Sequence, residues 1–149
     1  MKTPSLAARF LKNRDGAAAV EMAMVALPLT ILIFGSVEYG RAHWTAQALQ
    51  DTAVRAARCI GVRQSACSDK GAFDLHKSKA YTVETARGLG LSLDGTRVQI
   101  DPAATCGGRS GFVRVTLGYT FSSPLEGVLE KLGKGVTLGA EACFPSQPS

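Results

Sequence analysis

The chain has 149 residues, a formal net charge of +5 and four cysteines. This length suits one small domain with a terminal element and excludes two large domains. Three of the five net positive charges lie within the first 16 residues, and no basic stripe with interleaved aromatic residues follows, so the overall charge is a weak argument for nucleic-acid binding.

An apolar segment follows the basic N-terminus. Residues 22–37 carry no charge, and residues 17–37 would cover roughly 30 Å as a helix, the thickness of the hydrocarbon core of a bilayer. The sequence therefore predicts a transmembrane helix over residues 17–38, bent at Pro28. The positive charges that would hold the N-terminus in the cytoplasm are Lys2, Arg9, Lys12 and Arg14.

The helical pattern continues beyond the predicted membrane edge, over residues 39–60. Apolar residues recur there at steps of three and four, and polar residues take the other positions, which is typical of an amphipathic helix. We expect a single helix of roughly 60 Å from about Ala17 to about Cys59, with Gly61 as its stop. The predicted core-facing positions are Ala42, Ala46, Leu49, Ala53, Ala56 and Ile60.

Residues 61–149 are expected to form a small α+β head. The segment CIGVRQSACSDKG has the glycine, serine and aspartate content of a loop. A second helix is predicted over residues 73–87, ended by Gly88 and Gly90, with Phe73, Ala80 and Val83 facing a core.

Alternating apolar residues after this helix predict three strands of an antiparallel sheet. The first two strands are joined by the turn CGGRSG, and the longer connection SSPLEGVLEKLGKG allows a helical turn at residues 125–132. The residues that mark the strands are Val98 and Ile100, then Val113, Val115, Leu117, Tyr119 and Phe121, then Val136, Leu138, Ala140 and Ala142.

All four cysteines lie after the apolar segment, which suits an oxidising compartment and two disulfides. Three pairings are open to Cys59, Cys67, Cys106 and Cys143. If the second and third strands pair antiparallel, Cys143 returns beside the start of the second strand, where Cys106 lies. This topology favours Cys106 with Cys143 and leaves Cys59 to pair with Cys67.

The N-terminal stretch GAAAVEMAMVALPLTILIFGSVEYGR resembles the N-terminus of the TadE-like family, the minor pilins or pseudopilins of tight-adherence (Tad, Flp) pilus systems. The resemblance covers residues 14–58. It implies a pilin-like α+β protein, not an enzyme, that takes part in assembling a pilus or secretion pseudopilus. It also implies a single-pass protein of the bacterial inner membrane, with its head in the periplasm or carried into an extracellular pilus.

The resemblance assigns roles to four residues near the start of the apolar segment. A membrane-embedded prepilin peptidase would cut between Gly16 and Ala17 and remove residues 1–16 as a leader. Glu21 stands fifth in the mature chain and would pair with the new ammonium of a neighbouring subunit, because a carboxylate in a membrane is costly until it is paired. Met22 fills a place that often holds an aromatic or other large residue in the family.

A group of polar and aromatic residues marks the end of the apolar segment. Tryptophan and tyrosine favour the interface between membrane and water, so the group predicts contact with membrane lipid. A specific contact with the inner-membrane assembly platform is the alternative. The group consists of Glu38, Tyr39, Arg41 and Trp44.

Nothing in the sequence predicts catalysis, a cofactor or a metal. The cysteine spacing fits no standard zinc pattern, and His43 and His76 have no nearby nucleophile. The segment GVLEKLGKG lacks the spacing of a phosphate-binding loop and the hydroxyl after Lys134.

Two other classes of protein stay open. One is an uncleaved, signal-anchored periplasmic domain that binds a ligand or partner. The other is a secreted protein whose apolar segment is removed before Ser36, at a weak site formed by Ile33 and Gly35.

Overall fold

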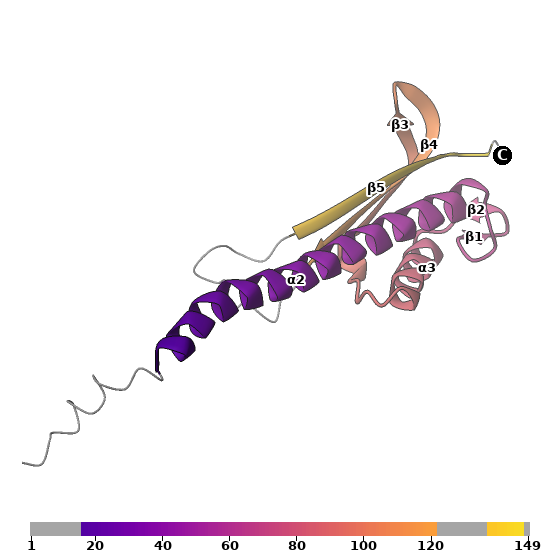
Figure 1. Cartoon of the computed structure of the whole chain (residues 1–149). Helices are drawn as coiled ribbons and strands as arrows, with labels where there is room; N and C mark the ends of the chain where they lie inside the picture. The colour runs from indigo at the N-terminus through magenta and orange to yellow at the C-terminus, as the bar shows by residue number, and fades with distance from the viewer. Residues whose placement is uncertain (1–15, 122–136, 148–149) are drawn as a thin grey trace, which may run out of the picture. The chain divides into compact units, whose positions relative to one another are not determined.

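The computed structural model describes residues 16–121 and 137–147. It confirms the α+β fold predicted from the sequence, a long N-terminal helix followed by a small three-stranded antiparallel sheet (Figure 1). The predicted helical turn at 125–132, Val136, the segment GVLEKLGKG and residues 1–15 of the predicted leader lie outside the described residues. The elements are α2 (Gly16–Gly61), β1 (Ser68–Asp69), β2 (Ala72–Phe73), α3 (Leu75–Gly88), the 3-10 helix η1 (Gly95–Arg97), β3 (Val98–Cys106), β4 (Arg109–Thr120) and β5 (Thr137–Pro145).

The chain divides into two compact units, Met1–Gly40 and Arg41–Ser149, and α2 contributes residues to both. We refer to the second unit as the head. The head contains the sheet, α3 and the remainder of α2, so its core can be described by itself.

The sheet of the head has the order β3-β4-β5, with antiparallel neighbours. β4 and β5 pair without interruption from Phe112↔Pro145 to Thr120↔Thr137. β3 and β4 are joined through Gly107 and Gly108, whose φ values of 57° and 77° lie in the left-handed region that glycine adopts at little steric cost. The turn predicted from CGGRSG is therefore a two-glycine hairpin turn.

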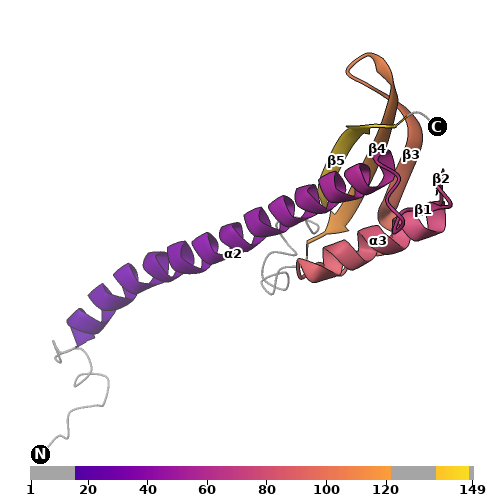
Figure 2. The ribbon, with the colours of Figure 1, turned by 90° about the vertical axis from the view of Figure 1, so that its right-hand side faces the viewer.

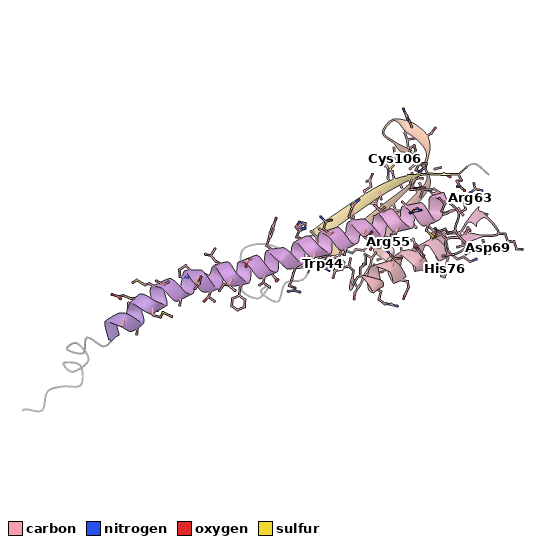
Figure 3. The ribbon with its side chains drawn as sticks, turned by 45° about the vertical axis from the view of Figure 1, so that its right-hand side comes forward. Trp44, Arg55, Arg63, Asp69, His76 and Cys106 are labelled. Atoms are coloured by element: carbon pink, nitrogen blue, oxygen red, sulfur yellow. A yellow bond between two sulfur atoms is a disulfide. The ribbon has the colours of Figure 1, made fainter. Side chains whose placement is uncertain are left out.

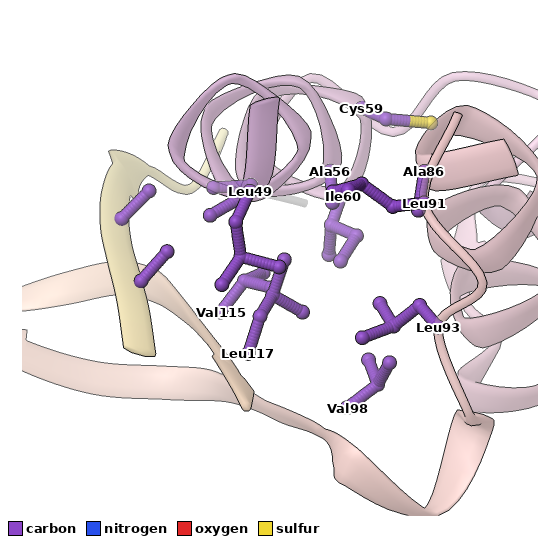
Figure 4. Packing of buried hydrophobic residues seen from close by; sticks show 14 of the residues in the cluster. Leu49, Ala56, Cys59, Ile60, Ala86, Leu91, Leu93, Val98, Val115 and Leu117 are labelled. Carbon is purple, nitrogen blue, oxygen red and sulfur yellow. The ribbon is translucent and has the colours of Figure 1, made fainter. Parts of the chain in front are cut away.

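One face of the sheet packs against α2 and α3 and forms the core of the head (Figures 2 and 4). Alternation along β4 places Val113, Val115 and Leu117 on this face, and each is at least 98% buried. Leu49 of α2 and Val98 of β3 are also fully enclosed. Burial of these side chains is the main favourable term in folding the head.

The core face of α2 is built largely from small residues. Leu49, Ala53, Ala56 and Ile60 are buried as predicted, and Ala42 and Ala46 are half-buried. The buried face is wider than predicted and includes Thr45 and Thr52, whose hydroxyls donate to Arg41 O and Ala48 O four residues earlier. Such back-bonding satisfies a buried hydroxyl without a partner from another element.

The core face predicted for α3 is wrong for Phe73 and Ala80, whereas Val83 packs against the core as predicted. Phe73 lies in β2 and is 38% exposed, Ala80 is exposed, and Val83 is half-buried. The buried face consists of Ser78, Thr82 and Ala86. Small hydroxylated side chains fit there because Ser78 Oγ donates to Cys67 O and Thr82 Oγ1 donates to Ser78 O, so neither hydroxyl is left unpaired.

Both ends of α3 have recognisable caps. Asp74 is the N-cap, and its carboxylate accepts from the backbone N–H of Lys77, which lowers the pKa of Asp74 from its ordinary value. At the other end, Leu91 N donates to Ala86 O and Gly90 N to Arg87 O, with Gly90 at φ 79°. This is a Schellman motif, and it confirms Gly90 as a terminating residue.

The helix α2 ends at Gly61, but Gly61 is not its left-handed cap. The Schellman bonds run from Gln64 N to Cys59 O and from Arg63 N to Ile60 O, and Arg63 holds the left-handed position at φ 53°. Gly61 is needed for space, since a Cβ there would lie 2.5 Å from Phe144 Cδ1 and 2.7 Å from the carbonyl oxygen of Pro145. The glycine therefore permits β5 to pass close to the end of α2.

The segment predicted as a loop is more structured than its composition indicates. Cys59 to Gly61 are still helical, and a small hairpin of β1 and β2 turns through Lys70 and Gly71, both with positive φ. The disulfide between Cys59 and Cys67 ties the helix end to this hairpin.

Candidate functional site

The first unit presents an apolar helical surface that the described part of the chain does not cover. The large apolar side chains between Val20 and Val37 are 54–73% exposed. A helix that is apolar all round is stable in lipid or against other helices rather than in water. Within the described residues, α2 is the one helix long and apolar enough to cross a membrane, which is compatible with a single-pass membrane anchor.

Polar groups within this apolar surface are satisfied by the helix itself. Thr30 Oγ1 donates to Ala26 O at 2.7 Å, and Ser36 Oγ donates to Ile33 O at 2.8 Å. Pro28 lies inside the helix and cannot donate to the carbonyl four residues earlier. Internal bonding of hydroxyls is what a hydrocarbon environment requires.

The residues predicted for processing and assembly lie at the start of this helix. α2 begins at Gly16, and Ala17 follows as its second residue. A Cβ on Gly16 would meet no described atom within 4 Å, so packing gives no reason for a glycine there. Glu21 and Met22 are both exposed, and the first turn of α2 contains no acidic residue.

A shallow apolar depression lies on the first turns of α2. It is lined by Ala19, Val20, Ala23, Met24 and Leu27. Ala19 and Ala23 are one turn apart, and small residues at that spacing let a second helix approach closely in a membrane. The sequence reasoning did not single out this depression, although the spacing of its alanines was visible.

The predicted interface group is divided between the two units. Glu38 and Tyr39 belong to the first unit, where Glu38 is half-buried and Tyr39 is 74% exposed. Arg41 belongs to the head, and its guanidinium carbon lies 5.8 Å from the ring centroid of Phe121. At that distance the two side chains form a cation–π contact between α2 and Phe121, the residue that follows β4.

Trp44, which Figure 3 labels, lines a small open groove on the head. The groove has a volume of about 230 Å³ and is also lined by Gln47, Ala48, Asp51 and Leu89. Asp51 accepts a hydrogen bond from Arg55 Nε at 2.9 Å, and this partner raises the pKa of Arg55. Trp44 is 69% exposed, so it remains available to lipid or to a partner.

The structure joins Cys59 to Cys67 and Cys106 to Cys143, the pairing that the sequence topology favours. The described residues contain no group of three or more potential metal ligands among His, Cys, Asp and Glu.

Comparison with protein-family models gives one decisive observation, a match over residues 16–58. Residues 16–58 are similar to TadE-like proteins. The match confirms the resemblance predicted from the sequence. It begins at Gly16 and includes Glu21, Met22, the interface group and most of the part of α2 that belongs to the head.

The TadE-like segment covers less than a third of the chain. It supports a protein associated with Tad pili, a structural kind of protein, and it suggests interaction with other pilus components. Comparisons with curated proteins and with solved structures find no match. The remainder of the head is therefore characterised by its own residues alone.

Proposed function

We propose that the protein is a minor pilin or pseudopilin that is processed after Gly16 and takes part in assembling a tight-adherence pilus or secretion pseudopilus. The match of residues 16–58 to TadE-like proteins carries this proposal. Its partners are a prepilin peptidase, other pilin subunits, the inner-membrane assembly platform and membrane lipid.

The proposed processing supplies a charge that the helix lacks. Cutting after Gly16 leaves a new ammonium on Ala17, one helical turn before Glu21. Glu21 is exposed at the edge of the uncharged stretch of α2, residues 22–37, where a carboxylate is costly unless it is paired. Pairing with the ammonium of a neighbouring subunit would remove that cost and set the stagger between subunits.

The apolar depression on the first turns of α2 supports close packing of two such helices. It is lined by the small Ala19 and Ala23 together with the larger Met24 and Leu27. Without a hydrophobic driving force in lipid, helices associate through close van der Waals contact and paired polar groups. The small residues would supply the contact, and Glu21 would supply the polar pair.

The mass of the mature protein tests the processing step. The full chain is extracted from membranes of its host while the pilus machinery is active, and its intact mass is measured. The proposal predicts an N-terminus at Ala17. An N-terminus at Met1 would identify an uncleaved anchor, and one at Ser36 would identify a secreted protein.

Two glycine variants give reciprocal controls. Gly16→Leu should leave the precursor uncut, whereas Gly35→Leu should be processed normally, since a Cβ at either glycine meets no described atom. If the site before Ser36 is the true one, only Gly35→Leu will accumulate as precursor. That outcome would overturn the proposal.

The role of Glu21 is tested separately from processing. Glu21→Leu should be cut normally and reach the membrane but fail to assemble with other subunits, because the carboxylate that pairs with the ammonium is missing. Glu21→Asp retains the charge and should retain assembly. Normal assembly by Glu21→Leu, measured by co-purification with other pilus subunits, would exclude the ion pair.

A further inference from the structure

The two disulfides of the head lie in contrasting environments. Cys59 and Cys67 are each 1% exposed and belong to the core. Cys106 is half-buried and Cys143 is exposed. An external thiol can therefore reach only the second disulfide without unfolding the head.

The exposed disulfide connects two strands that are not neighbours. β3 and β5 flank β4, and strands in such positions lie roughly 9–10 Å apart. The Cα atoms of Cys106 and Cys143 are only 6.5 Å apart. Register shifts between Asp101 and Cys106 bend the end of β3 while Cys106 stays paired with Arg109, and Figures 1 and 2 show the β3–β4 hairpin bending towards its tip.

Arg114 lies beside this disulfide on the face of the sheet opposite the core. It is the cross-strand partner of Cys143. Its Nη2 donates to Thr105 O and lies 3.7 Å from Cys106 Sγ. Figure 3 labels Cys106 beside the β3–β4 hairpin. A guanidinium at this position stabilises negative charge on the sulfur of Cys106.

Glu141 opposes this effect. Its Oε1 lies 3.4 Å from Arg114 Nε, and that nitrogen makes no hydrogen bond among the described residues, so the contact is an ion pair alone. The carboxylate of Glu141 is 54% exposed and is partly screened by water. The guanidinium of Arg114 therefore remains the charged group in contact with Sγ of Cys106.

We propose that Cys106–Cys143 is a thiol-exchange site whose co-reactant is a dithiol, such as the reduced form of a dithiol oxidoreductase. One thiolate of the dithiol attacks Sγ of the exposed residue Cys143, forming a mixed disulfide and breaking the bond to Cys106. Cys106 leaves as a thiolate that Arg114 stabilises. The second thiolate of the dithiol then attacks the first sulfur of the same dithiol, which is bonded to Cys143 in the mixed disulfide. This step closes the disulfide of the reagent and releases the Cys143 thiolate. The dithiol is oxidised by two electrons, and the protein disulfide is reduced by two.

The exchange would free the tip of the β3–β4 hairpin while the rest of the head stays folded. The core face of β4 and the disulfide between Cys59 and Cys67 do not depend on the second bridge. The same reaction run in reverse would close the bridge during folding, with the oxidised reagent accepting the electrons.

Timed exchange with thiols tests the site in the full-length chain in detergent. The protein is treated with dithiothreitol, quenched in acid, alkylated with N-ethylmaleimide and mapped by mass spectrometry. We expect alkylation of Cys106 and Cys143 while Cys59 and Cys67 remain paired. With glutathione in place of dithiothreitol, the glutathione adduct should form on Cys143. Equal reduction of both disulfides, or an adduct only on Cys106, would overturn the proposal.

Three variants separate stabilisation of the leaving group from loosening of the hairpin. Arg114→Gln should slow exchange by about three- to tenfold because the departing thiolate loses its cation, whereas loss of a merely structural contact would speed exchange. Arg114→Lys should retain most of the rate. Glu141→Gln removes the opposing charge and should speed exchange, which keeps the test decisive if Arg114→Gln does not fold.

The matched control is Arg87→Gln, which removes an exposed arginine that pairs with Glu84 at 3.0 Å in α3. It should exchange at the wild-type rate. Arg114→Gln reacting as fast as this control, or Glu141→Gln reacting more slowly than it, would exclude the assigned role of Arg114.

Discussion

Replacement of Gly61 by alanine should destabilise the head, even though alanine is the better helix former. A Cβ at this position would lie 2.5 Å from Phe144 Cδ1 and 2.7 Å from Pro145 O. The Phe144 ring can rotate, but the Pro145 carbonyl is part of the backbone. That backbone is held because Gln147 N donates to Gly61 O at 2.9 Å and Ser146 N donates to Gly111 O at 2.8 Å.

The expected cost follows from two opposing effects. Overpacking of a closed site costs about 1–3 kcal/mol, and Gly→Ala in a helix gains at most about 1 kcal/mol, less at a helix end. We expect a net loss of about 1–2 kcal/mol in the free energy of unfolding. Gly88 is the matched control, since it also ends a helix but a Cβ there meets no described atom. Gly88→Ala should be neutral or slightly stabilising.

Urea unfolding of the full-length chain in detergent measures both variants. Trp44 is the single tryptophan, and it lines the groove between α2 and Leu89, so its emission reports on packing of the head. The midpoint should fall for Gly61→Ala and stay or rise for Gly88→Ala, with unchanged slope. If the two variants are equally stable, the close approach of β5 to α2 does not constrain residue 61, and the reasoning fails.

Two further predictions test the core of the head and the N-cap of α3. Leu117→Ala should lower the free energy of unfolding by about 2–5 kcal/mol because Leu117 is 1% exposed. Leu75→Ala, the control, should change it by less than about 0.5 kcal/mol because Leu75 is 48% exposed. Urea titration compares the two variants. The pKa of Asp74 is lowered below 3.8 by the N–H of Lys77, so its contribution is complete above pH 3.8 and is lost as pH falls through the folded value. Asp74→Asn keeps an acceptor without the charge. The free energy of unfolding of this variant, measured by urea titration at several acidic pH values, should therefore depend less on pH in this range.

The elements with a strong apolar period were predictable from the sequence. The spacing of Leu49, Ala53, Ala56 and Ile60 predicted the buried face of α2, and alternation predicted β4. Strand order then followed from the short turn, and it brought the correct cysteines together. These features depend on local pattern and on a single topological step.

The features that were missed depend on contacts distant in sequence. The buried face of α3 contains Ser78 and Thr82, which a search for large apolar residues cannot find. Gly61 was interpreted as a cap because helix ends favour glycine, but its role is set by Phe144, more than eighty residues later. Arg114 could have been placed near Cys143 only once the register of β4 and β5 was known.

The distribution of burial predicts that assembly and head folding can be changed independently. Large side chains of residues 20–37 are exposed, whereas the core consists of residues from Ala48 onwards. Glu21→Leu removes no contact within the core, so its urea midpoint should equal that of the unsubstituted chain even if assembly is lost. Gly61→Ala, in contrast, should weaken the head without preventing cleavage after Gly16. If Glu21→Leu lowers the midpoint as Gly61→Ala does, loss of assembly would reflect misfolding, and Glu21 could not be assigned to contact between subunits.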